Sequence, residues 1–357
     1  MTGLNHCVAL TEEPVRPTTC TIIARVWDDC GLAARGGAPR PSLIAVAVSA
    51  GLLACTHGSD SPVGLQRAAV IHGADDRRDP CSVAEDAFVR VARQGTAALI
   101  PRGALVDAPG GVSVRAPSVA VTHDLCRDGP FAEQPAAATC TGVLVAEDLI
   151  LTAGHCLPAP DECPQECIVF DYEMCDDQGA MIAPDGIFVC AEVVWNGEEQ
   201  EVPLDLALLR LDRSVPDRYA PVRLAQRPAR VFQPVIVAGH PEGLPLKLDA
   251  GGQVVVVPEA PTGPIHLTSD TFVGSSGSGV FDLNGRLLAI LSQGQRDYEP
   301  AEGLGCSRPV RIRELRRDTL YERATPVWTS LQILRIDHNG PYSRAVETAA
   351  TNRGDGP

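Results

Sequence analysis

The sequence predicts an all-β fold, and three observations lead to this prediction. From about residue 112 onward, short aliphatic and β-branched runs recur, as in TGVLVA (141–146), LALLRL (206–211) and RLLAILS (286–292). The chain contains 33 glycines and 30 prolines, which favour frequent turns. Helical patterns are few. Many short strands separated by turns are typical of a β-barrel or a β-sandwich.

Other segments of the chain fit the same scheme. Asn284-Gly285 predicts a two-residue turn between two strands. The pattern also predicts a short helix over 83–94 and a second one within 311–324, near the C-terminus. The remaining predicted strands are TAALIP (96–101), VSVRA (112–116), SVAVT (118–122), LILTA (149–153), FVCAEVVW (188–195), VIVAG (235–239), GQVVVVP (252–258), IHLTS (265–269) and GVFDL (279–283).

The composition excludes one class of function and indicates a compartment. The chain has 30 basic and 45 acidic residues, which gives a formal net charge of −15. Nucleic-acid binding needs a basic face, so we do not expect it here. The 13 cysteines fit an oxidising compartment better than a reducing one.

An export signal is expected near the N-terminus. LIAVAVSAGLLA (43–54) is an apolar run that follows Arg35 and Arg40. It is too short to cross a bilayer comfortably and suits the core of a signal peptide. The ending LLAC (52–55) resembles a bacterial lipobox, which implies lipidation of Cys55 and a membrane-tethered mature protein. The alternative is an ordinary signal peptide cleaved nearby, with Cys55 incidental.

Three motifs carry residues suited to nucleophilic catalysis. They are TAGHC with His155, PLDLALLRL with Asp205, and GSSGSG with Ser276. Serine is a weak nucleophile unless a histidine takes its proton, and that histidine needs a carboxylate on its other nitrogen. Glycines beside a serine allow two backbone N–H groups to point into one pocket, where they can stabilise an oxyanion. The order histidine, aspartate, serine argues against a lipase-type site, in which serine comes first.

These motifs resemble those of the chymotrypsin-like serine peptidases, and among them the bacterial branch that includes the glutamyl endopeptidases. The similar blocks are CTGVLVAEDLILTAGHC (140–156), DLALLRL (205–211) and DTFVGSSGSGVF (270–281). VIHGADDRRD (70–79) is similar to the start of the mature glutamyl endopeptidases. The resemblance implies two six-stranded antiparallel β-barrels with the site in the cleft between them.

The resemblance also implies a role for each motif residue. His155 corresponds to the general base, Asp205 to the residue that orients it, and Ser276 to the nucleophile. The amides of Gly274 and Ser276 correspond to the oxyanion hole. Ser278 is the competing serine, but only Ser276 has the family's flanking glycines in register.

A disulfide and a specificity pocket follow from the same resemblance. Cys140 and Cys156 are expected to form a disulfide that fixes the histidine loop. Asp270 stands where trypsin has the acid that selects Arg or Lys, although an aspartate there is also usual in the bacterial branch, where it serves structure. A preference for basic, acidic or other residues therefore stays open. The expected pocket residues are Asp270, Thr271, Ser292, Gln293 and Gly294.

A cysteine-rich run, residues 163–190, has two interpretations. Its cysteines, at 163, 167, 175 and 190, lie among acids, which could indicate zinc. The spacing lacks a Cys-x-x-Cys pair, so a disulfide-stapled insertion is favoured, and we expect no metal and no cofactor. Seven mature cysteines remain beyond Cys55, Cys140 and Cys156, so one is free or pairs externally. A bond between Cys126 and Cys306 is expected across the domain.

Five segments are expected along the chain. They are a pre-region with signal peptide (1–54), a linker (55–69), an N-terminal extension (70–111), a trypsin-like peptidase domain (112–337) and a disordered tail (338–357). We expect cleavage before Val70 to mature the enzyme. The sequence as a whole predicts an exported, monomeric serine endopeptidase, lipid-anchored or extracellular, that acts on proteins or peptides. The alternative is an inactive binding module of the same fold at the cell surface.

Overall fold

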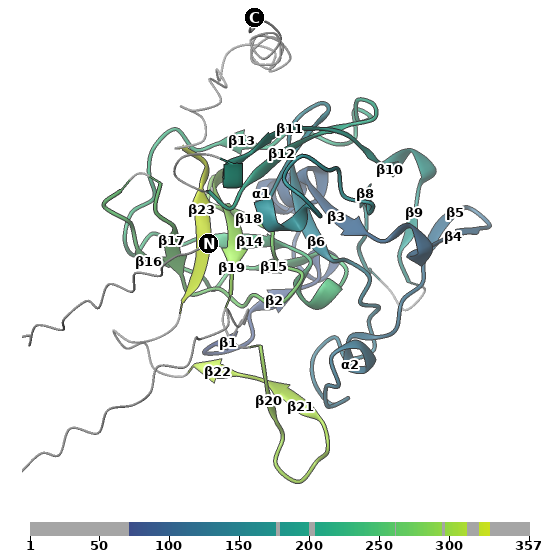
Figure 1. The fold of residues 1–357 in the computed structure, drawn as a ribbon. Helices are drawn as coiled ribbons and strands as arrows, with labels where there is room; N and C mark the ends of the chain where they lie inside the picture. The colour runs from purple at the N-terminus through teal and green to yellow at the C-terminus, as the bar shows by residue number, and fades with distance from the viewer. Residues whose placement is uncertain are drawn as a thin grey trace, which may run out of the picture. The chain divides into compact units, whose positions relative to one another are not determined.

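Two large β-sheets form the described part of the protein (Figure 1). The computed structural model describes residues 71–175, 179–199, 204–260, 262–294, 297–312 and 321–328. All of them belong to one unit, residues 60–357. The expected signal peptide, lipidation site, linker and tail, with Val70, lie outside the described residues.

The first sheet is antiparallel and carries the histidine and aspartate motifs. Its seven strands run in the order β10-β8-β3-β6-β7-β12-β11. The middle strands are buried along their whole length because both faces are covered by apolar side chains. The bounds are β10 Ile187–Phe188, β8 Cys167–Val169, β3 Thr96–Ile100, β6 Cys140–Ala146, β7 Leu149–Thr152, β12 Ala207–Leu211 and β11 Cys190–Asn196.

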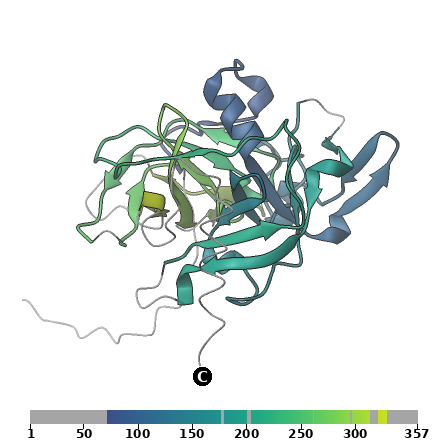
Figure 2. The same ribbon diagram turned by 90° about the horizontal axis from the view of Figure 1, so that it is seen from above.

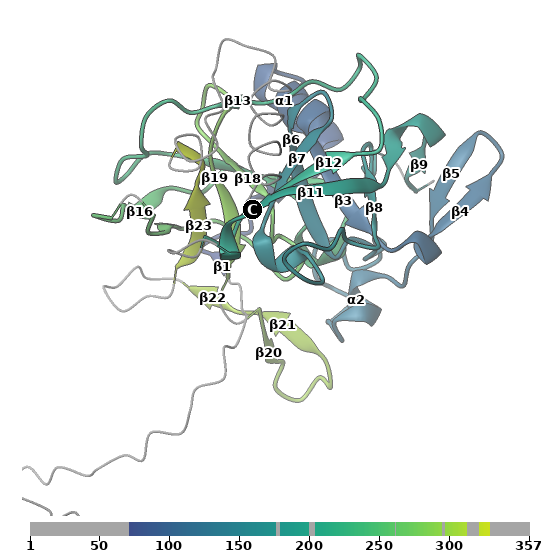
Figure 3. The same ribbon diagram turned by 45° about the horizontal axis from the view of Figure 1, so that its top comes forward.

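The second sheet carries the serine motif and contains nine strands. Eight run in the order β16-β17-β23-β19-β18-β14-β15-β2, and β13 pairs in parallel with β19. Figure 3 shows this sheet beside the first one, as Figure 1 does. The bounds are β16 Val254–Val256, β17 Ile265–Leu267, β23 Glu322–Pro326, β19 Arg286–Gln293, β18 Gly279–Phe281, β14 Ile236–Gly239, β15 Lys247–Asp249, β2 Arg77–Arg78 and β13 Arg223–Leu224.

Smaller elements surround the two sheets. β1 (Ile71–His72) pairs in parallel with β22 (Arg311–Ile312), and β20 (Tyr298–Pro300) pairs with β21 (Ser307–Pro309). β4 (Leu105–Ala108), β5 (Gly111–Val114) and β9 (Met181–Ile182) form a third small sheet. The short 3-10 helices are η1 Pro80–Ser82, η2 Arg102–Ala104, η3 Gly154–Cys156, η4 Pro184–Gly186, η5 Gly197–Glu199 and η6 Pro241–Gly243.

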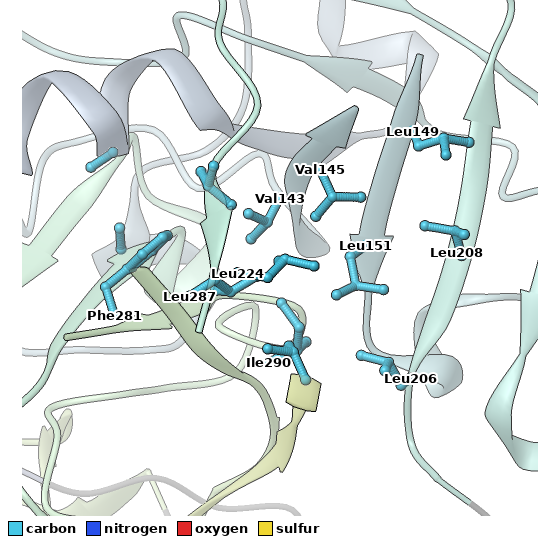
Figure 4. Packing of buried hydrophobic residues seen from close by; sticks show 14 of the residues in the cluster. Val143, Val145, Leu149, Leu151, Leu206, Leu208, Leu224, Phe281, Leu287 and Ile290 are labelled. Atoms are coloured by element: carbon cyan, nitrogen blue, oxygen red, sulfur yellow. The ribbon is translucent and has the colours of Figure 1, made fainter. Parts of the chain in front are cut away.

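One apolar cluster joins the two large sheets (Figure 4). Val143, Leu151 and Leu208 face it from the first sheet, and Leu287 and Ile290 face it from the second. The two sheets therefore share a core rather than packing independently. Because residues of the proposed site come from both sheets, this shared core sets the distance between them.

The helix predicted over 83–94 is present as α1 (Ala87–Gly95) and lies at the top of Figure 2. The carboxylate of Asp86 caps it by accepting the amide of Val89 at 2.8 Å. Its buried face includes Phe88, whose ring meets that of Phe281 edge-on at 5.6 Å. α1 thus covers the junction between the two sheets.

The all-β prediction with two barrel-like sheets is confirmed, but the strand counts differ. The sheets contain seven and nine strands instead of six each, because two- and three-residue strands such as β10, β2 and β13 extend them. The segment 118–122 is wrong as a strand, since Val119–Thr122 form a helical turn, α2. The predicted helix within 311–324 is wrong at both ends, where β22 and β23 lie. Residues 313–320 are outside the described part.

The hairpin at Asn284-Gly285 is present, but its turn has three residues instead of two. The amide of Gly285 donates to the carbonyl of Asp282 at 2.9 Å, and that of Asp282 donates to Arg286. Gly285 has φ +71°, and Asn284 does not adopt a positive φ. A turn followed by a glycine in the left-handed region is the usual three-residue hairpin.

The expected boundary at residue 112 divides one folded core. β3 lies between β8 and β6 in the first sheet, and α1 packs on the core cluster. Both belong to the segment 70–111. We therefore assign residues 71–111 to the same domain as the strands that follow.

In the described part of the chain, no helix has the length and apolar character to cross a membrane.

Four disulfides connect distant parts of the described chain. Cys167 is free and buried. The cysteine-rich run is stapled both internally and to the N-terminal segment, which favours the disulfide interpretation over zinc because a single thiol of its four cysteines remains. The bonds are Cys81–Cys175, Cys126–Cys306, Cys140–Cys156 and Cys163–Cys190.

We predict that Leu287→Ala lowers the free energy of unfolding by about 2–5 kcal/mol, because Leu287 is fully buried at the junction of the sheets. Leu283→Ala is the matched control, since Leu283 is 61% exposed in the same hairpin and should change stability by less than about 0.5 kcal/mol. Denaturant unfolding of the oxidised protein measures both. Equal losses in the two variants would contradict the placement of the core.

Candidate active site

Three loops bring His155, Asp205 and Ser276 together. β7 and β12 are antiparallel neighbours, with Thr152 at the end of β7 opposite Ala207 at the start of β12. His155 lies in the short 3-10 turn that follows β7, and Asp205 precedes the first residue of β12 by two positions. The strand pairing therefore sets the two side chains at the same end of the sheet. Ser276 reaches them from the loop that enters β18 of the second sheet.

The three side chains form a continuous line of hydrogen bonds. His155 Nδ1 lies 2.8 Å from Asp205 Oδ2 and 3.0 Å from Oδ1. The Oδ1 atom also accepts the backbone amide of His155 at 3.0 Å. Because an ionised carboxylate only accepts, Nδ1 must carry the proton, and Nε2 is then the acceptor in neutral histidine. Nε2 lies 2.8 Å from the hydroxyl oxygen of Ser276.

The serine loop depends on two glycines in the left-handed region. Gly274 has φ +89° and Gly277 has φ +86°. A Cβ atom at Gly274 would lie 2.9 Å from the backbone of both His240 and Gly243, and one at Gly277 would overlap the carbonyl of Thr141. Neither position has room for a side chain, and the conformation itself disfavours one. These glycines let the loop turn tightly enough to present Ser276.

Two amides of this loop are uncommitted to the rest of the described chain. The amide of Ser275 donates to the carbonyl of Phe272, and that of Gly277 donates to Leu291, both at 2.8 Å. Within the described residues, the amides of Gly274 and Ser276 donate to no acceptor of the chain. Paired free amides beside a nucleophilic hydroxyl are the arrangement that stabilises an oxyanion.

Thr141 links the serine loop to the first sheet, and the sequence patterns did not single it out. Its amide donates to the carbonyl of Ser276 at 2.7 Å, and its own carbonyl accepts the hydroxyl of Thr152 at 2.7 Å. Its hydroxyl accepts the amide of His240 at 3.1 Å. A polar β-branched residue at the buried start of an apolar strand was the available signal.

Asp205 also has support from the second sheet. The hydroxyl of Thr325, at the end of β23, donates to its backbone carbonyl at 3.1 Å. His155 and Asp205 keep 17% and 21% of their side-chain surface exposed. The hydrogen-bonded line is thus held by both sheets, and His155 and Asp205 remain partly exposed to solvent.

The carboxylate of Asp270 is already occupied by hydrogen bonds. Its carboxylate accepts the amide of His72 on Oδ1 and the amide of Asp76 on Oδ2, each at 2.8 Å. The side chain is 4% exposed, and burial and the nearby carboxylate of Asp249 raise the pKa of Asp270. Both oxygens are therefore used by backbone of the N-terminal segment. Of the two uses left open for Asp270, these contacts favour the structural one.

Of the other expected pocket residues, Ser292 and Gln293 lie on β19, and Thr271 and Gly294 lie in loops. The hydroxyl of Thr271 donates to Glu322 Oε2 at 2.7 Å. The hydroxyl of Ser292 donates to the carbonyl of Arg323 at 3.2 Å, and Arg323 in turn donates to the side chain of Gln293. Gly294 follows directly after the end of β19. These contacts place the residues together at the β19–β23 edge without defining a charge preference.

His240 is buried and has a structural role. Its Nδ1 donates to the carbonyl of Leu244 at 3.0 Å, and its ring stacks on Tyr172. Burial lowers the pKa of His240 to about 3, so the ring is neutral at ordinary pH. A neutral ring beneath the serine loop adds packing without a competing charge.

The comparison with protein-family models agrees with this picture of the fold. Residues 140–290 match the family model of the trypsin-like peptidase domain. No match was found among the curated proteins.

Solved structures similar to this chain include peptidases. Two describe inactive forms of the Rv3671c protease from M. tuberculosis H37Rv, at 17% and 18% identity. They cover 57% and 55% of this chain and 83% of that chain, with TM-scores of 0.34. A Glu endopeptidase in complex with MPD is 18% identical and covers 74% of this chain and 98% of that chain, with a TM-score of 0.40.

The matched segment contains His155, Asp205 and Ser276, and it spans the strands that bring them together. Residues 140–290 are thus similar to a trypsin-like peptidase domain.

Proposed function

We propose that the protein is a serine endopeptidase that hydrolyses peptide bonds through an acyl-enzyme. The observation that carries this proposal is the line Asp205–His155–Ser276, with heavy-atom distances of 2.8 Å at both links. These distances fall within the range needed for proton transfer between a nucleophile and its base. A carboxylate, an imidazole and a hydroxyl are seldom hydrogen-bonded in this order by chance.

The geometry supports the following sequence of steps. The hydroxyl of Ser276 attacks the scissile carbonyl while His155 Nε2 takes its proton. Asp205 holds the ring in the tautomer that leaves Nε2 free and stabilises the imidazolium that forms. The amides of Gly274 and Ser276 receive the oxyanion. His155 then gives the proton to the leaving amine, and water releases the acyl group by the same route.

The cellular setting is a second part of the proposal. Four disulfides among the described residues favour an oxidising compartment, since such bonds are rare in a reduced cytosol. The lipobox-like LLAC before residue 56 favours a lipid anchor on Cys55. Proteins or peptides outside the cytoplasm are then the substrates. We propose a monomer.

Two rival functions share the fold. An inactive binding module would keep the sheets but has no need of hydrogen-bonded His155 and Ser276, so the short 2.8 Å contact disfavours it. An esterase would use the same site on a different bond. Cleavage of a peptide library by the purified protein separates an esterase from an endopeptidase.

We predict that a fluorophosphonate probe labels the oxidised protein on Ser276, because the hydroxyl of Ser276 lies 2.8 Å from His155 Nε2. Ser276→Ala should abolish labelling. Ser278→Ala should retain it, since the Ser278 hydroxyl is fully buried and contacts Thr141 instead of His155. Mass spectrometry of the labelled peptide checks the site. An unlabelled but folded parent protein would favour the inactive binding module.

We predict that Asp205→Asn lowers kcat by about 10⁴-fold while the protein stays folded, because the amide would favour the wrong histidine tautomer. Asp217→Asn is the control, since Asp217 is an exposed acid further along the same segment. Steady-state hydrolysis of the best library peptide measures both variants. A fall of less than tenfold in Asp205→Asn would exclude this residue from the orienting role.

A further inference from the structure

Arg77 is a buried cation that the steps above leave unused. Its side chain is 1% exposed, which is rare for arginine unless its charge is paired. Nη2 lies 2.8 Å from Asp75 Oδ2, and Nη1 lies 2.6 Å from Glu242 Oε2. The guanidinium also stacks over the ring of Phe272, 4.2 Å from its centre. Arg77 therefore joins the N-terminal segment to two loops that border the proposed site.

We propose that Arg77 and Glu242 are positioning residues that orient the peptide between Val273 and Gly274, so that the Gly274 amide faces the oxyanion. This inference rests on the proposed function. Neither side chain touches the substrate in this role. Both act through the backbone of the serine loop.

The first link is the conformation of Glu242. This residue has φ +59°, in the left-handed region that side chains other than glycine seldom adopt. Its carboxylate is held at both oxygens, by Arg77 on Oε2 and by the hydroxyl of Tyr298 on Oε1 at 2.7 Å. A strained backbone persists when its surroundings fix it, and here the two side-chain contacts do so.

The second link runs from Glu242 to the oxyanion site. The amide of Glu242 donates to the carbonyl of Val273 at 2.6 Å. In a trans peptide the C=O and the following N–H point in opposite directions. Holding the carbonyl of Val273 toward Glu242 therefore points the amide of Gly274 the other way, away from Glu242 and free of any acceptor in the described chain.

The third link is the ring of Phe272, which precedes Val273. Its face is covered by Arg77, and its amide donates to the Ser275 hydroxyl at 3.1 Å. Arg77 thus contacts the serine loop through the ring of Phe272, and Glu242 contacts it through the carbonyl of Val273.

Other contacts keep the N-terminal segment in place when Arg77 is changed. Asp270 accepts two of its amides, as described above, and Lys247 pairs with Asp79 at 2.6 Å. β2 also pairs with β15. Loss of the Arg77–Glu242 contact should therefore loosen the serine loop while the N-terminal segment stays bound. A fall in turnover can then be distinguished from detachment of the N-terminal segment.

The test is steady-state hydrolysis of p-nitrophenyl acetate by the oxidised full chain, with Ser276→Ala as the blank. Arg77→Ala should lower kcat at least tenfold with KM within about twofold, because removal of an oxyanion donor costs about 10²–10³ in kcat without weakening ground-state binding. Arg77→Lys, which keeps the charge on a shorter side chain, should restore part of the loss. Arg78→Ala, at the exposed neighbour, should match the parent.

A paired variant guards against misfolding, because a lone buried charge destabilises a protein. Arg77→Met combined with Glu242→Gln and Asp75→Asn removes the charges of all three paired groups and keeps side chains of similar length. We expect it to melt near the parent temperature and still show the low kcat. Parental kcat in this folded variant, or in folded Arg77→Ala, would overturn the positioning role alone. Ester turnover that is absent in the parent, or survives in Ser276→Ala, would overturn the proposed function and this inference with it.

Discussion

The hydrogen bond from the amide of Thr141 to the carbonyl of Ser276, at 2.7 Å, joins the two sheets at the point where the site forms. Thr141 is the second residue of the buried strand β6, and Ser276 lies in the loop before β18. Without a fixed contact there, His155 from one sheet and Ser276 from the other could not keep a separation of 2.8 Å. The apolar cluster beneath them supplies the stiffness, because close-packed side chains from both sheets resist sliding.

Short local motifs allowed the serine turn and the histidine loop of the site to be predicted from the sequence. Gly274 and Gly277 predict a tight turn with positive φ angles, which glycine adopts readily. The apolar strand that ends at Thr152 indicates where the histidine loop begins. Pairing of β7 with β12 then brings Asp205 to His155. Each of these signals lies within a few residues of the group it positions, so a sequence pattern can carry it.

The unpredicted part depends on contacts between residues far apart in the chain. Asp270 stands at a position that suggests a substrate pocket, yet it accepts an amide from His72, 198 residues away. No local pattern distinguishes these two uses of a carboxylate. The domain boundary is also hard to predict from local patterns. The sequence shows that β3 is a strand, but it does not show that β3 pairs with β6 and β8 of the first sheet. The segment SVAVT has strand propensity but forms the turn α2, because tertiary context overrides a short apolar run.

The central claim is that Ser276 is the nucleophile of a preset oxyanion site. The most direct measurement is a crystal structure of the protein after reaction with diisopropyl fluorophosphate. The account predicts phosphorus bonded to the hydroxyl oxygen of Ser276, with a phosphoryl oxygen within about 2.7–3.1 Å of the amide nitrogens of Gly274 and Ser276. A modified residue elsewhere, or a phosphoryl oxygen turned away from both amides, would contradict it.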